Sequence, residues 1–497
     1  MPTLPDRDAG LFSAETGSLA SLEAAVRRDF ARINHPPANW PLPVTGPDGA
    51  PVLDVLVVGA GQFGQTAAFA LLRDGVRNIR VVDRAARGQE GPWATTARML
   101  TLRSPKHLTG PDLGIPALTF RAWYEAQHGA AGWESLYKID RLQWVDYLLW
   151  VREMAAIPVE NDTALLSLEP AGGLLRASLR GADGAEQTVF ARQVVLASGR
   201  DGNGGVRRPV FPSLPADQSG AVFHSNDAID FERFRDRRVA VLGASASAFD
   251  NAGAALEAGA SVTLFCRRPH LPQVNRSRGL VFAGYLHGFA RLDDARRWDW
   301  LTLTSDTATP PPHESVLRCE RHAGFSLRFG VAWHDVSADR DGVTVLTDSV
   351  PLRFDAAILG TGFAMDLARQ PELAAFHDHA LLWRDQVPAN AAASYPDLAG
   401  HPYLAEGFAL TERAPGCCPE LGRVRMFGAA AAVSYGILAG DIPALATGAL
   451  RLARSITDAL FIEDADRHRA AMMVFEEPEL RPTSYYVPPE QRRGRVV

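Results

Sequence analysis

The sequence contains few cysteines, and their spacing is not typical of a metal or redox site. Its 497 residues include four cysteines, at positions 266, 319, 417 and 418, and no C-x-x-C or C-x-x-C-H pattern. This spacing argues against a disulfide framework, a cysteine-based zinc or iron–sulfur site and a c-type haem. Only the adjacent pair Cys417 and Cys418 suggests a thiol switch, and adjacent cysteines rarely form a disulfide bond because the bridge is strained.

Long apolar runs and an excess of positive charge are also missing. No apolar run reaches the roughly 18 residues that a membrane span needs. The net charge of −6, from 51 Lys and Arg against 57 Asp and Glu, argues against a nucleic-acid binder that depends on positive charge. Residues 1–8 lack the basic and apolar regions of a secretory signal, so we expect a cytoplasmic protein.

The chain can form several sizeable hydrophobic cores. Apolar residues make up 46% of it and charged residues 22%, and its length suggests about three folding units. Residues 1–50 contain one amphipathic stretch, Leu19 to Ile33, and then many prolines. We therefore expect an N-terminal helix followed by an extended arm that covers the first sheet.

The first glycine-rich signature directly follows the apolar run Val55 to Val58. It reads Gly59-Ala60-Gly61-Gln62-Phe63-Gly64 and fits G-x-G-x-x-G between a predicted strand and a predicted helix. In this motif the glycines permit a tight turn, close approach of a pyrophosphate and close helix packing. Asp83 ends the next predicted strand, where an acid accepts hydrogen bonds from ribose hydroxyls.

A second, weaker signature follows the run Val239 to Leu242. It reads Gly243 to Ala248, with Ser245 in place of the middle glycine. The next predicted strand ends in Cys266-Arg267-Arg268 rather than in an acid. Guanidinium groups suit a 2′-phosphate, which favours NADPH over NADH, although the two arginines could also be a solvated surface pair.

Two nucleotide sites of opposite charge predict two different nucleotides, and the usual partner of a nicotinamide is a flavin. The predicted fold class is α/β, with two Rossmann-like dinucleotide-binding domains and the NADPH domain inserted in the FAD domain. We expect the first part of the FAD domain at 51–205 and the NADPH domain at 206–345. The second part, with a C-terminal helix from about Asp441 to Phe461 and a tail, is expected at 346–497.

Over roughly residues 52–460 the sequence resembles the two-dinucleotide-binding flavoprotein monooxygenases of class B. Besides the two signatures, the segment Gly91-Pro92-Trp93 is similar to one beside the flavin in that group. The segments 101–105 and 118–124 resemble a loop and an F-x-x-Y motif of its ornithine and lysine N-hydroxylases. Leu359 to Phe363 is similar to their A-T-G-Y motif.

The resemblance implies FAD and NADPH as cofactors and no catalytic side chain or metal. The implied cofactor-binding residues are Gly59, Gly61, Gln62, Phe63, Gly64, Asp83, Arg84, Trp93, Leu102, Ser104, Gly199, Gly243, Ser245, Ser247, Arg267, Arg268, Gly362, Gly440 and Asp441. The implied substrate-binding residues are Arg103, Lys106, His107, Asn275 and Tyr435, with Trp123 as a further wall candidate. A surface ion pair would explain Arg103 or Lys106 equally well, and a plain helix cap would explain Asp441 nearly as well as a cofactor contact does.

The implied activity is oxygenation of a small metabolite through a flavin C4a-(hydro)peroxide, by N-hydroxylation of an amine or amino acid or by hydroxylation of a heteroaromatic ring. Dioxygen is the second substrate, neither a nucleic acid nor a membrane is expected as a partner, and homo-oligomerisation stays open. The Baeyer–Villiger fingerprint is missing, and the only trace of it is a histidine, His224, before the second glycine unit. The alternatives are an NADPH-dependent reductase that passes electrons to a protein or quinone, and a redox sensor.

Overall fold

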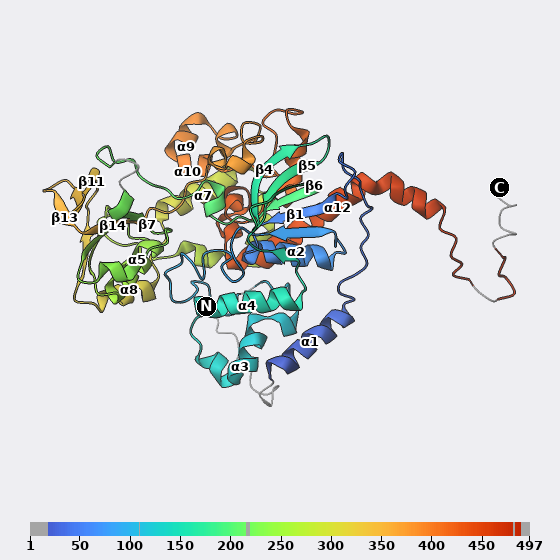
Figure 1. Cartoon of the computed structure of the whole chain (residues 1–497), viewed down its shortest axis with the longest axis horizontal. Helices are drawn as coiled ribbons and strands as arrows, with labels where there is room; N and C mark the ends of the chain where they lie inside the picture. Colours follow the sequence, from blue (N-terminus) through green and yellow to red (C-terminus); the bar gives the residue numbers. More distant parts are fainter. Residues whose placement is uncertain (1–17, 109, 215–218, 481–482, 489–497) are drawn as a thin grey trace.

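The computed structural model describes residues 18–108, 110–214, 219–480 and 483–488 (Figure 1). One mixed and one parallel sheet form its centre, and in each sheet one strand leads into a glycine-rich turn that the sequence predicts. The predicted α/β class with two dinucleotide-binding units is confirmed. Within the described residues, no helix is both long enough and apolar enough to cross a membrane.

The first sheet has seven strands, and its order is β3-β2-β1-β6-β5-β4, with β15 also paired to β6. Strands β1, β2, β3 and β15 run parallel to their neighbours, whereas β4, β5 and the first half of β6 form an antiparallel extension. The strand bounds are Leu53–Val58 (β1), Ile79–Val82 (β2), Val159–Glu160 (β3), Ala164–Pro170 (β4), Leu175–Arg180 (β5), Glu186–Leu196 (β6) and Val424–Met426 (β15).

The second sheet is parallel throughout, in the order β10-β9-β8-β14-β7. A three-stranded antiparallel sheet, β11-β12-β13, adjoins it. The bounds are Val222–His224 (β7), Arg238–Leu242 (β8), Ser261–Cys266 (β9), Phe325–Phe329 (β10), Asp335–Asp339 (β11), Gly342–Leu346 (β12), Leu352–Phe354 (β13) and Ala356–Leu359 (β14). Residues 346–359 therefore belong to the second unit, and the expected boundary after residue 345 is wrong, because β14 pairs with β7 and β8.

The helices connect these strands and cover the sheets. Their bounds are Leu19–Arg32 (α1), Gln62–Arg73 (α2), Phe120–Ser135 (α3), Arg141–Met154 (α4), Ala246–Glu257 (α5), Ala283–Gly288 (α6), Asp294–Thr307 (α7), His313–Glu320 (α8), Ala389–Ser394 (α9), Pro396–Ala399 (α10), Ala432–Tyr435 (α11) and Leu445–Met473 (α12). The last helix begins later and ends twelve residues later than the expected 441–461. Its distal end projects from the body of the molecule (Figure 1).

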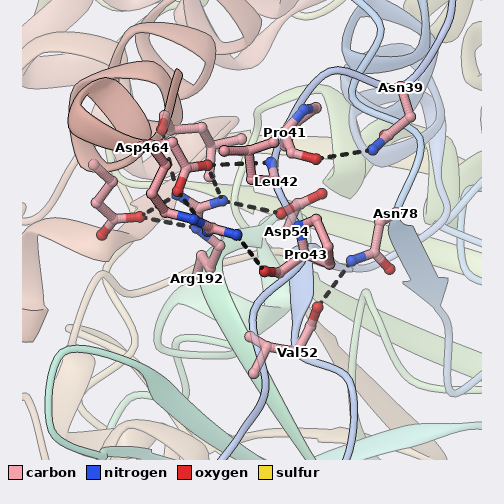
Figure 2. Close-up of polar contacts among 12 residues, drawn as sticks. Asn39, Pro41, Leu42, Pro43, Val52, Asp54, Asn78, Arg192 and Asp464 are labelled. Carbon is pink, nitrogen blue, oxygen red and sulfur yellow. Dashed lines mark hydrogen bonds and ion pairs between the residues drawn. The ribbon is translucent and has the colours of Figure 1, made fainter. Parts of the chain in front are cut away.

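A buried ion cluster joins the N-terminal arm, the first sheet and α12 (Figure 2). The Arg192 guanidinium on β6 donates to Asp464 at 2.9 Å and to Asp54 at 3.3 Å, and it also pairs with Glu463. Asp464 in turn accepts a hydrogen bond from the Leu42 amide of the arm, at 3.2 Å. The cluster thus connects three chain segments that are far apart in the sequence.

Candidate functional site

The first glycine-rich turn lies at the carboxyl end of β1. Gly59 has φ +97°, and a Cβ there would lie 2.5 Å from the Ala197 carbonyl oxygen. A Cβ on Gly64 would lie 1.7 Å from the Gly59 carbonyl oxygen. These two glycines are therefore required by packing within the chain. At Gly61, in contrast, the nearest atoms belong to Gly91 and lie 3.8 Å away, so a side chain would fit. The missing side chain at Gly61 keeps open the N-terminal end of α2, where backbone N–H groups and the helix dipole attract an anion.

Asp83 follows β2 and faces the same turn. Its carboxylate accepts hydrogen bonds from the Ala60 amide at 2.7 Å and the Ala85 amide at 2.8 Å. Burial raises the pKa of this carboxyl group, and the two amide donors partly offset the shift. Each carboxylate oxygen retains an acceptor position, which a ribose hydroxyl could use. Arg84 is exposed and pairs with Asp201 at 2.8 Å.

Segments from the far end of the chain complete this edge of the sheet. Phe63 of α2 contacts Phe427 edge-to-face, with ring centroids 5.0 Å apart, directly after β15. Gly440 packs closely on Ala429, where a Cβ would meet the Ala429 Cα at 2.8 Å. The structure thus brings Gly61, Gly91 and the segment 427–441 to one edge, as the carboxyl ends of parallel strands require.

Asp441 lies at this edge and pairs with Arg200, Nη2 to Oδ1 3.3 Å. Surrounding protein raises the pKa of the Asp441 carboxyl, and Arg200 and Arg103 partly offset this, although 46% of the side chain is open to solvent. Sequence reasoning missed Arg200. The available signal was its place directly after Gly199, which has φ +71° and no neighbouring atom within 4 Å of an added Cβ.

The packing of the second glycine-rich turn explains why its sequence can differ from the G-x-G-x-x-G motif. Gly243 has φ +108°, and a Cβ there would lie 2.6 Å from the Gly360 carbonyl oxygen. Ala248, at the position of the third glycine, fits because residue 360 has no side chain; a Cβ on Gly360 would lie 2.7 Å from that of Ala248. Ser245 is exposed at the N-terminus of α5, and its side chain makes no capping hydrogen bond.

Arg267 and Arg268 lie exposed directly after β9, next to the second turn. Neither guanidinium group makes an ion pair with a described residue. Gly362 nearby has φ +79° and open space around its Cα, and the Ser247 carbonyl accepts a bond from Asn251 within α5. The second turn therefore combines an open helix N-terminus with two unpaired positive charges.

A cavity of about 620 Å³ adjoins the first unit. Lys106 and His107 line it together with α3 and the beginning of α12. The Lys106 ammonium group donates to the Trp133 carbonyl at 2.5 Å and lies 4.5 Å from the centre of the Trp133 ring. Ile442, Pro443 and Ala446 form the opposite wall, next to Asp441. Two of the predicted substrate residues therefore share a cavity beside the predicted cofactor edge.

The structure does not bring the other predicted substrate residues into this cavity. Arg103 instead pairs with Asp250 of α5, Nη2 to Oδ2 3.1 Å, so it connects the two units. Asn275 caps the turn at residues 276–280. Tyr435 is buried against Phe408, with ring centroids 4.3 Å apart.

The remaining predicted positions have structural contacts of their own. Trp123 is buried in the aromatic cluster of α3 and α4, and Leu102 is buried with its amide bonded to the Ile139 carbonyl at 2.8 Å. Gln62 accepts from the Trp144 indole at 3.1 Å, and Ser104 is half-buried. The Trp93 carbonyl accepts from Arg141, which fixes the segment next to Gly91.

Comparison with known proteins agrees with this arrangement. The pyridine nucleotide-disulphide oxidoreductase family model matches residues 56–280. An FAD-dependent urate hydroxylase from Xanthomonas campestris pv. campestris is 40% identical over 467 residues, covering 93% of this chain and 97% of that protein.

Among solved structures, an ornithine hydroxylase from Pseudomonas aeruginosa has a TM-score of 0.65 at 16% identity. An ornithine N-hydroxylase from Kutzneria sp. 744 has a TM-score of 0.64 at 17% identity. Each match covers 82% of this chain and 100% of the other. These structures share the fold, whereas the hydroxylase from Xanthomonas is a relative along nearly the whole sequence. The chain is therefore an oxidoreductase with two dinucleotide-binding units, and it belongs to the same family as that FAD-dependent urate hydroxylase.

Proposed function

We propose that this protein is an FAD- and NADPH-dependent monooxygenase that hydroxylates urate or a closely related oxopurine. The 40% identity to a urate hydroxylase over 93% of the chain carries this proposal. It favours heteroaromatic hydroxylation over N-hydroxylation of an amine or amino acid. In the net reaction, NADPH supplies two electrons, one oxygen atom of O₂ enters the product and the other leaves as water.

The residues of the first unit fit FAD. The open position at Gly61 and the N-terminus of α2 would hold the diphosphate, and Asp83 would accept from the ribose hydroxyls. Gly91, Trp93 and the segment Gly440–Asp441 would surround the rest of the cofactor. Bound FAD supplies the redox chemistry with dioxygen, and the chain contributes binding, orientation and exclusion of water.

The residues of the second unit fit NADPH. The N-terminus of α5 at Ser245 and Ser247 would face the diphosphate, and Arg267 with Arg268 would hold the 2′-phosphate. Dependence on a pyridine nucleotide supports a cytoplasmic location. Substrate and dioxygen are the partners that this activity requires.

We assign substrate binding to the cavity lined by Lys106 and His107. Urate is an anion at neutral pH, and the Lys106 ammonium group would offer it a charge-assisted hydrogen bond. The Lys106 ammonium group has three N–H donors, so it can keep its bond to the Trp133 carbonyl and still donate to a bound substrate.

Mass spectrometry under ¹⁸O₂ tests the proposal. The purified enzyme with FAD and NADPH should incorporate one labelled oxygen atom into urate, and should leave ornithine, lysine and cadaverine unchanged. NADPH oxidation without label in any product, coupled to reduction of a quinone or ferredoxin, would support the reductase instead. Lys106→Met should raise KM for urate far more than it lowers kcat, whereas Lys138→Met, which removes a lysine bound to Glu314 outside the cavity, should change neither.

A further inference from the structure

The distal part of α12 leaves large apolar side chains more than half exposed to solvent. Ile462 is 73% exposed, Met472 and Met473 are each 68% exposed, and Phe461 is also exposed. The same helix is well buried before this point, at Leu452, Ile456 and Leu460. A change from a buried to an exposed apolar pattern within one continuous helix indicates a contact surface for another molecule.

The exposed side chains form one strip along the helix. Phe461, Ile462, Ala465, Arg469, Met472 and Met473 recur at spacings of three, four and seven residues, so they share one side of α12. The opposite side faces the protein, because Asp464 pairs with Arg192 and Arg467 donates to the Pro43 carbonyl at 3.0 Å. These contacts hold the helix in place as far as Arg467, so the strip has a fixed orientation. Figure 1 shows that this end of the helix stands clear of both sheets.

The strip is complementary to itself. When two copies of α12 run antiparallel about a two-fold axis near Arg467, helix geometry brings Phe461 next to Met472 of the second copy and Ile462 next to Met473 of the second copy. The same arrangement brings Asp466 beside Arg469 of the second copy, so unlike charges meet on both sides of the axis. Apolar side chains thus face apolar ones, and each Arg469 has an acidic neighbour, Asp466, on the second copy.

We propose that the strip on α12 is a dimer interface that binds the same strip of a second copy of this chain. The contact pairs the projecting helices antiparallel, with the two-fold axis near Arg467. Val474 and Phe475, exposed directly after the helix, would extend the contact at both ends. This interface is independent of the proposed activity, because it lies on the part of α12 that is remote from Asp441.

Sedimentation velocity of the full-length FAD-loaded protein tests this interface. The wild type should be a dimer, and Ile462→Glu or Met472→Glu should each produce a monomer. Leu450→Glu is the matched control, because it places the same charge at an exposed apolar residue of α12 outside the strip and should leave the dimer intact. A monomeric wild type, or a dimer that survives both strip substitutions, would overturn the proposal.

Disulfide trapping gives a second measurement that does not depend on breaking the contact. In a chain carrying both Ile462→Cys and Met473→Cys, the two thiols are about 16 Å apart along the helix and cannot bridge within one chain. Oxidation should therefore give a covalent dimer on a non-reducing gel, whereas the double variant Leu450→Cys with Met473→Cys should stay monomeric on the same gel. Equal crosslinking of both variants would contradict the antiparallel register.

Discussion

Three glycines of the first turn serve two different purposes. Gly59 and Gly64 leave no room for a side chain because neighbouring backbone lies within 2.5 Å of an added Cβ. Gly61 has ordinary backbone dihedrals, with φ −67°, and free space beside it. Packing within the fold requires Gly59 and Gly64, whereas we propose that Gly61 is required by the bound cofactor, and substitution can separate the two requirements.

Gly61→Ala should weaken FAD binding at least tenfold while changing the stability of the apoprotein by less than about 1 kcal/mol. Gly64→Ala should destabilise the apoprotein by more than about 3 kcal/mol, because the Gly59 carbonyl would have to move. Flavin absorbance after reconstitution and urea unfolding of the apoprotein measure the two effects. A Gly61→Ala protein that keeps its full flavin content would contradict the role of that residue.

At the second turn, we propose that the positive charges of Arg267 and Arg268 select the nucleotide. Arg267→Ala together with Arg268→Ala should raise KM for NADPH about tenfold or more and leave KM for NADH nearly unchanged. The control is Arg235→Ala, which removes an exposed arginine of the same unit that pairs with Glu232. Steady-state rates of urate-dependent oxidation of NADPH and NADH measure these KM values. An equal rise of KM for both nucleotides would show that the arginines do not bind the 2′-phosphate.

At the scale of elements, the Arg192 cluster holds the N-terminal arm, β1, β6 and α12 together (Figure 2). One buried arginine faces three carboxylates, the buried ones of Asp54 and Asp464 and the partly exposed one of Glu463. Burial dominates at Asp54 and raises its pKa to about 6, against the opposing effect of Arg192. This carboxyl therefore binds its proton more tightly in the folded chain than in the unfolded one.

The sign of the resulting pH dependence follows from linkage. As the pH rises from about 4 to about 6, Asp54 loses its proton first in the unfolded state, so the contribution of Asp54 to the stability of the wild type decreases over this interval. Asp54→Asn cannot titrate, and its stability relative to the wild type should increase by about 2–3 kcal/mol between pH 4 and pH 7. Urea unfolding at several pH values measures this difference. The control is Asp458→Asn, at an exposed aspartate of α12, and its stability relative to the wild type should not change with pH in this way.

At the scale of the whole molecule, Arg103 connects the two nucleotide-binding units. It pairs with Asp250, whose other carboxylate oxygen accepts from the Ser315 hydroxyl at 2.6 Å. Asp250 is buried, so removal of the Arg103 guanidinium leaves the Asp250 carboxylate buried and without one of its hydrogen-bond donors.

Arg103→Met should therefore destabilise the protein by about 1–3 kcal/mol and speed up amide hydrogen exchange around Ser315. The double variant with Asp250→Asn should recover most of this loss, because the uncompensated charge is then absent as well. Equilibrium unfolding and hydrogen-exchange mass spectrometry measure both effects. Equal stability of Arg103→Met and the wild type would mean that the pair does not hold the units together.

Local pattern predicted both glycine-rich turns, their strands and Asp83, because these depend on residues close together in the sequence. The cavity residues Lys106 and His107 were also predicted together. The boundary after residue 345 failed because the pairing of β14 with β7 and β8 is long-range and leaves no local signal. The ion pair of Arg103 was not predicted because its partner, Asp250, lies 147 residues away in the sequence. Tyr435 does not line the cavity, and its packing contact with Phe408 likewise leaves no local signal in the sequence.

The pairing of β15 with β6 also has a consequence for synthesis on the ribosome. Roughly 230 residues separate these neighbouring strands, and the whole second sheet lies between them in the sequence. At about 5–20 residues per second, the edge of β6 at Val194 to Leu196 waits tens of seconds for its final neighbour. All strands of the second sheet are synthesised before β15, the last strand of the first sheet. Nascent chains should therefore complete the inner, second unit before the outer, first unit.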